Sequence, residues 1–89
     1  MTGIEVLVLE DNPDDVVLIA EALEQNGFPQ QMICNASTLA RAKEYLAQRD
    51  FDVILADLNV PDSLGLGTVD ALRLAAESTP LVVLTGTLE

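Results

Sequence analysis

Short apolar runs alternate along the chain with stretches in which apolar residues recur at helical spacing. The runs are Ile4 to Leu9, Gln31 to Ala36, Phe51 to Ala56 and Leu81 to Leu84. Their lengths and their β-branched residues are typical of strands buried in a parallel sheet. The stretch from Val53 to Ala56 has no polar alternation, so we expect helices to cover both faces of that strand.

The segment after the first run carries a helix start signal. Asn12 suits the N-cap and Pro13 the first helical position, and two acids, Asp14 and Asp15, follow in the first turn. An amphipathic stripe comes next, made of Val16, Ile19, Ala20 and Leu23. Gly27, with Pro29 just beyond, predicts the end of this helix.

Two further helices are predicted. Ser37 is the expected N-cap of the first, which ends near Arg49 and has its apolar positions at Leu39, Ala42 and Leu46. The second follows a loop rich in turn residues and ends before Pro80. Its apolar positions are Leu66, Val69, Leu72 and Ala76.

The resulting order, βαβαβαβ, predicts an α/β fold with an open, doubly wound parallel sheet and helices on both faces. We expect the flavodoxin-like strand order 2-1-3-4 and one domain over residues 1–89. An apolar strand at a sheet edge promotes association. We therefore expect the natural domain to continue beyond the fourth strand, and this chain to form a homo-oligomer through it.

Composition narrows the possible functions. Fifteen acidic residues outweigh four basic ones, and the formal net charge is −11 at pH 7. So few bases exclude the basic face that nucleic acids and anionic membranes require. The sequence has no histidine, which excludes His/Cys zinc sites and a histidine general base. Cys34 is the single cysteine, and no signal or spanning segment is visible, so we expect a cytoplasmic protein.

Three carboxylates follow two of the predicted strands. Glu10 and Asp11 follow the first strand, and Asp57 follows the third. If these strands are neighbours, the carboxylates converge where open parallel sheets bind ligands. Like charges packed this closely repel unless a divalent cation neutralises them, and an all-oxygen ligand set suits Mg²⁺. The alternative is that these acids are only solvated strand ends.

The remaining motifs are weaker evidence for a function. Thr85 ends the fourth strand, where its hydroxyl would reach an anionic group built on Asp57, and Gly86 leaves room for a ligand. The acidic stretch from Asp11 to Asp15 lacks the glycine and the distal glutamate of a calcium loop. No glycine-rich phosphate loop follows the first strand, so nucleotide binding is not supported.

Three segments together resemble the response-regulator receiver domains of two-component signalling. They are Asp57-Leu58-Asn59-Val60-Pro61 with Gly65 beyond, Val6 to Asp11, and Val82 to Gly86. Their mutual spacing is also that of the family, and they span nearly the whole chain. The family's fifth-strand lysine and aromatic residue and its fifth helix have no counterpart in the 89 residues. The resemblance therefore implies a receiver lacking its fourth helix, fifth strand and fifth helix.

The resemblance also implies roles for individual residues. Asp57 would accept a phosphoryl group from a histidine kinase or a phosphotransfer protein. Asp11 and Asp57 would bind Mg²⁺ directly, Glu10 would act through a bound water, and the backbone carbonyl of Asn59 would supply a further oxygen. Thr85 and Gly86 would contact the phosphoryl group, Thr85 as a switch residue. Such a domain is a phosphoacceptor and not an enzyme acting on other substrates.

Two other functions stay open. The first is a pseudo-receiver or scaffold that acts through protein contacts without phosphorylation. The second is a phosphohydrolase with an aspartyl-phosphate intermediate. Such enzymes usually have an acid two residues after the nucleophile, where this chain has Asn59.

Overall fold

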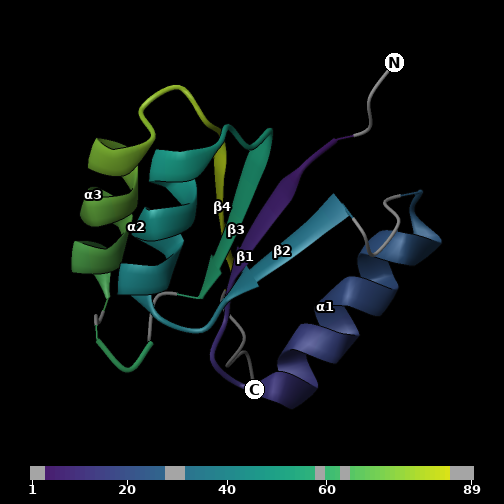
Figure 1. Cartoon of the computed structure of the whole chain (residues 1–89). Helices are drawn as coiled ribbons and strands as arrows, with labels where there is room; N and C mark the ends of the chain where they lie inside the picture. The colour runs from purple at the N-terminus through teal and green to yellow at the C-terminus, as the bar shows by residue number, and fades with distance from the viewer. Residues whose placement is uncertain (1–3, 28–31, 58–59, 63–64, 85–89) are drawn as a thin grey trace.

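Four parallel strands form one sheet in the order β2-β1-β3-β4, as predicted (Figure 1). The computed structural model describes residues 4–27, 32–57, 60–62 and 65–84. The strands are β1 (Val6–Leu9), β2 (Ile33–Ala36), β3 (Val53–Asp57) and β4 (Leu81–Leu84). The helices are α1 (Pro13–Gln25), α2 (Leu39–Gln48) and α3 (Leu66–Ala75). The predicted α/β class and element order are confirmed.

The central strand β1 is buried along its whole length. It pairs with β2 on one side and with β3 on the other, and Leu9 is level with Ala36 and with Ala56. Alternate residues of a strand point to opposite faces, so Leu7 and Leu9 enter the main core while Val6 and Val8 face the other side. The apolar run predicted as the first strand therefore forms the centre of the sheet.

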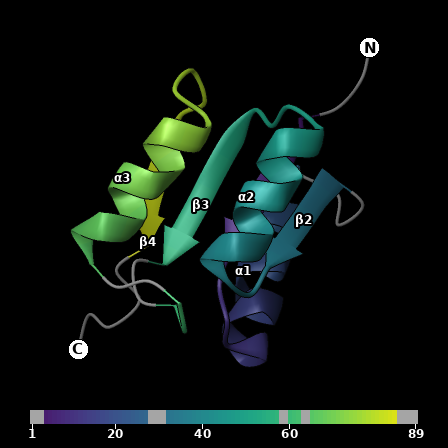
Figure 2. The ribbon, with the colours of Figure 1, turned by 60° about the vertical axis from the view of Figure 1, so that its left-hand side comes forward.

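The main core lies between the sheet and the pair of helices α2 and α3, which cover the same face (Figures 1 and 2). Leu39 and Ala42 of α2 and Leu72 of α3 are buried there. They pack with Ile54 and Ala56 of β3 in one cluster. Both helices are amphipathic, and most of their predicted apolar positions are buried or half-buried. Leu66, predicted as an apolar position of the last helix, is instead 75% exposed at the first turn of α3, where Thr68 is the buried residue.

Helix α1 lies on the opposite face of the sheet from α2 and α3, to the right of β2 in Figure 1 and behind β2 in Figure 2. Its start is as predicted, because the Asn12 side chain accepts a hydrogen bond from the Asp14 N–H at 2.9 Å. The predicted stripe is half-buried, while Val17 and Leu18 between its members are 54% and 63% exposed. Gly27 follows with a φ of 95°, a conformation that favours glycine.

Two further details of the predicted elements are wrong. Thr38, not Ser37, is the N-cap of α2, and its hydroxyl accepts a hydrogen bond from the Arg41 N–H at 3.1 Å. Helices also do not cover both faces of β3 equally. Ile54 is buried, but Val53 and Leu55 on the opposite face are only half-buried, because α1 lies beside β2 and away from β3 (Figure 1).

The remaining boundaries differ by a few residues. The first two strands begin two residues later than predicted, at Val6 and Ile33, and β3 runs from Val53 to Asp57. None of the helices in the described ranges is long and apolar enough to cross a bilayer.

Candidate functional site

The carboxylates of Glu10, Asp11 and Asp57 gather at the carboxyl edge of the sheet. Because β1 and β3 are neighbours and Leu9 is level with Ala56, the residues that follow them emerge side by side. One oxygen from each carboxylate lies within 4.8 Å of the others. The predicted convergence of these residues is confirmed. We call them the acidic cluster.

Glu10 is the buried member of the cluster, with 5% of its surface exposed. One of its carboxylate oxygens accepts a hydrogen bond from the Asn12 N–H at 3.2 Å. Burial raises the pKa of Glu10, and the negative charges of Asp57, Asp15 and Asp11 raise it further, while the Asn12 N–H opposes them.

The main chain at Glu10 is held by β2. The Glu10 N–H donates to the Ala36 carbonyl at 2.9 Å, and the Asn35 side-chain amide donates to the carbonyls of Glu10 and Val8, at 3.2 and 3.1 Å. Sequence reasoning missed Asn35. The signal that could have found it is that Asn35 is the one amide side chain in the four described strands.

The donor set fits a small, hard cation. Asp11 is exposed and Asp57 is half-buried, so the cluster opens to solvent on one side. Carboxylate oxygens with room for water are the ligands that Mg²⁺ prefers, because this ion keeps several of its waters. A divalent charge also offsets the repulsion among three carboxylates. Glu10, Asp11 and Asp57 are therefore the residues that would hold Mg²⁺.

A further acid follows β3 in the chain, and the sequence did not single it out as a site residue. Asp62, in the loop after β3, accepts hydrogen bonds from the backbone N–H groups of Leu39 and Ala40. These N–H groups, that of Ala40 foremost, lower the pKa of Asp62. The predicted site residues Asn59, Thr85 and Gly86 lie outside the described residues.

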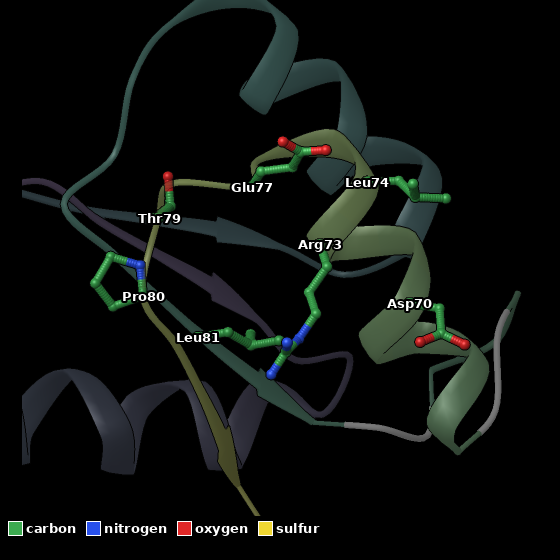
Figure 3. Close-up of a pocket in the computed structure, with 7 residues that line it drawn as sticks. All are labelled: Asp70, Arg73, Leu74, Glu77, Thr79, Pro80 and Leu81. Atoms are coloured by element: carbon green, nitrogen blue, oxygen red, sulfur yellow. The ribbon is translucent and has the colours of Figure 1, made fainter.

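A groove of about 710 Å³ lies elsewhere, between α3 and the start of β4. Figure 3 shows Arg73 reaching from α3 across Leu81, with Asp70 and Leu74 on the same helix. The groove is at the amino end of β4, whereas the acidic cluster is at the carboxyl edge of the sheet. It therefore contributes nothing to the cluster.

Comparison with known proteins agrees with this geometry. Residues 6–89 match the family described as the response regulator receiver domain. The chain belongs to this family. It is accordingly a receiver domain of two-component signal transduction, and its acidic cluster resembles the receiver active site.

Individual relatives are similar to this chain in sequence over most of its length. The chain is 34% identical over 80 residues to the swarming motility regulation protein RssB of Serratia marcescens, covering 90% of this chain and 35% of that protein. It is 33% identical over 87 residues to the cell cycle transcriptional regulator CtrA of Caulobacter vibrioides, covering 94% of this chain and 35% of that protein. The receiver domain thus spans about a third of the length of these relatives.

Solved structures share the fold. The response regulator MaeR bound to beryllium trifluoride superimposes with a TM-score of 0.83 at 27% identity, over 98% of this chain and 70% of MaeR. The chemotaxis response regulator CheY4 of Vibrio cholerae gives a TM-score of 0.79 at 27% identity, over 98% of this chain and 72% of CheY4.

Proposed function

We propose that this receiver domain accepts a phosphoryl group on Asp57. The observation that carries the proposal is the meeting of Asp57 with Glu10 and Asp11 within 4.8 Å at the carboxyl edge of the sheet. Asp57 is half-buried at the end of β3, where the strand limits its motion and an incoming group can still approach. A carboxylate in this position is a suitable nucleophile for phosphorus.

The transfer is a displacement at phosphorus. A carboxylate oxygen of Asp57 forms the new bond to phosphorus while the bond to the donor breaks. The donor is a phosphohistidine of a histidine kinase or of a phosphotransfer protein, so its ring nitrogen is the leaving group. The product is an acyl phosphate on Asp57, and the domain is the acceptor of the group and not a catalyst for other substrates.

Asp11 and Asp57 would bind Mg²⁺ directly, Glu10 through a water, and Asn59 through its backbone carbonyl. When bound, Mg²⁺ offsets the negative charge that the carboxylates and the phosphoryl oxygens bring together. One Glu10 oxygen accepts the Asn12 N–H, and the other can accept a hydrogen bond from a water bound to the ion. We further propose that Thr85 and Gly86 contact the phosphoryl group.

The location and partners follow from this function. The domain would work in the cytoplasm, where a histidine kinase or a phosphotransfer protein supplies the group. The relatives RssB and CtrA are named as regulators, so the output of the full-length protein is regulatory in this proposal.

We also propose that the domain self-associates through β4. This strand lies at one end of the sheet order and pairs with β3 alone within the described ranges. Val82 and Val83 are 47% and 37% exposed. A strand edge with free backbone groups and exposed valines favours pairing with another copy.

Incubation with acetyl phosphate and Mg²⁺, followed by intact mass spectrometry, tests the phosphoacceptor role. We expect one added phosphoryl group on the chain, and none on Asp57→Asn. Asp70→Asn is the matched control, because it removes an exposed carboxylate of α3 outside the acidic cluster. An unmodified chain, with no response to Mg²⁺, would favour the scaffold function instead.

A further inference from the structure

A side chain from the loop after β3 caps the amino end of α2. The carboxylate of Asp62 accepts hydrogen bonds from the N–H groups of Leu39 and Ala40, at 2.8 and 2.9 Å. These are the first two residues of α2, where N–H groups have no partner within the helix. Asp62 lies 23 residues after Leu39 in the sequence, so the contact joins two separate segments.

The helix does not need Asp62 to have a cap. Thr38 already supplies the local cap, because its hydroxyl accepts a hydrogen bond from the Arg41 N–H. The N–H groups of Ala40 and Leu39 lower the pKa of Asp62, so its carboxylate is ionised and lies at the positive end of the helix dipole. The contact with Asp62 therefore ties the loop to the helix in addition to capping it.

The contact between Asp62 and α2 fixes the segment that follows Asp57. Only two residues separate Asp57 from Val60 in the sequence. Val60 is 3% exposed and packs in the main core, and Pro61 restricts the backbone after it. Asp62 then adds the attachment to α2, so the segment from Val60 to Asp62 is fixed at both ends.

We propose that Asp62 is a positioning residue for the acidic cluster. By attaching the loop to the amino end of α2, Asp62 holds the outgoing end of β3, and with it Asp57, in register with the carboxylates that follow β1. Groups that do not bind the metal themselves can set the geometry of the residues that do. The inference rests on the proposed function, because it assumes that the cluster holds Mg²⁺.

Calorimetric titration of the full chain with MgCl₂ tests the role of Asp62. We expect Asp62→Ala to bind Mg²⁺ about tenfold more weakly, or weaker still, and to be phosphorylated more slowly by acetyl phosphate at limiting Mg²⁺. Asp62→Asn keeps one of the two acceptor oxygens, so its affinity should be intermediate. Thr38→Ala is the matched control, because it removes a hydrogen bond from the same helix end without releasing the loop.

Melting curves of the same variants separate positioning from helix stabilisation. If Thr38→Ala and Asp62→Ala lower the melting temperature alike and both bind Mg²⁺ like the wild type, Asp62 only caps α2 and the inference is wrong. If Asp62→Ala does not fold, the affinity of Asp62→Asn decides by the same criterion. A wild-type chain that binds no Mg²⁺ contradicts the proposed function itself, before any variant is compared.

Discussion

Leu9 and Ala56 lie opposite each other in the pairing of β1 with β3. The next residue of each strand, Glu10 and Asp57, is charged, so two carboxylates leave the sheet side by side and Asp11 joins them. Apolar side chains hold the two strands together up to this point, and the acids that follow repel one another. The domain thus uses the stability of its most buried strand to keep like charges close.

Mg²⁺ should stabilise the fold, because the ion relieves this repulsion only in the native state. At ten times the dissociation constant, the gain in the free energy of unfolding is about 1.4 kcal/mol. That gain corresponds to a rise of about 6–11 °C in melting temperature for a domain of this size. Thermal melts with and without Mg²⁺, followed by circular dichroism, measure it. An equal rise in Asp11→Asn would show that the ion binds elsewhere.

Asp57→Asn should leave the fold intact. The substitution removes the proposed nucleophile and one of three crowded negative charges, so the melting temperature without Mg²⁺ should stay the same or rise. One kcal/mol corresponds to about 4–8 °C here. Mass spectrometry after acetyl phosphate treatment should detect no added phosphoryl group. Phosphate incorporation that persists in this variant would move the acceptor to another residue.

The buried Glu10 should make stability depend on pH. Its pKa in the folded chain is raised, mainly by burial, above the ordinary value of 4.5. The folded state therefore binds more protons than the unfolded state between these two pKa values, and stability falls as the pH rises through that range. The cost is complete above the folded pKa and absent well below pH 4.5.

Glu10→Gln isolates this contribution. Without Mg²⁺, the variant should be more stable than the wild type at pH 7, and the difference should shrink as the pH is lowered toward the ordinary pKa of 4.5. Urea titrations at several pH values measure it. The same protonation competes with the metal, so Mg²⁺ should stabilise the wild type less at pH 4.5 than at pH 7. A difference between wild type and variant that does not change with pH would contradict the raised pKa.

Local sequence signals predicted the sheet and the acidic cluster. The apolar run of β1 and the unbroken run in β3 indicated buried parallel strands, and the acids came directly after them. Their convergence then depended only on β1 and β3 being neighbours, which the structure confirms. Asn12 and Pro13 likewise marked the start of α1 through chemistry that acts within one turn.

The two side chains near the site that sequence reasoning missed, Asn35 and Asp62, both join distant segments. Asn35 bonds to the carbonyl of Glu10, 25 residues away, and Asp62 bonds to α2 across a comparable separation. No local propensity reports such contacts. The Ser37 error is of another kind: serine and threonine both suit an N-cap, and the path of the chain after β2 decides which of the two is used.

Self-association should depend on β4, and a pair of valines on different elements tests this. Val83 faces the α2 and α3 side of the sheet, level with Ala56, and is 37% exposed. Val17 is 54% exposed on α1, away from β4.

Lysine at either position changes the net charge equally, so general repulsion between acidic chains falls by the same amount in both variants. We expect Val83→Lys to weaken the assembly and Val17→Lys to leave it unchanged or strengthen it, because only the first places a charge on β4, which pairs with β3 alone in the part of the chain that the structure describes. Sedimentation equilibrium at micromolar concentration measures both. A wild-type chain that stays a folded monomer, or a Val17→Lys variant that dissociates as readily as Val83→Lys, would show that β4 is not the contact.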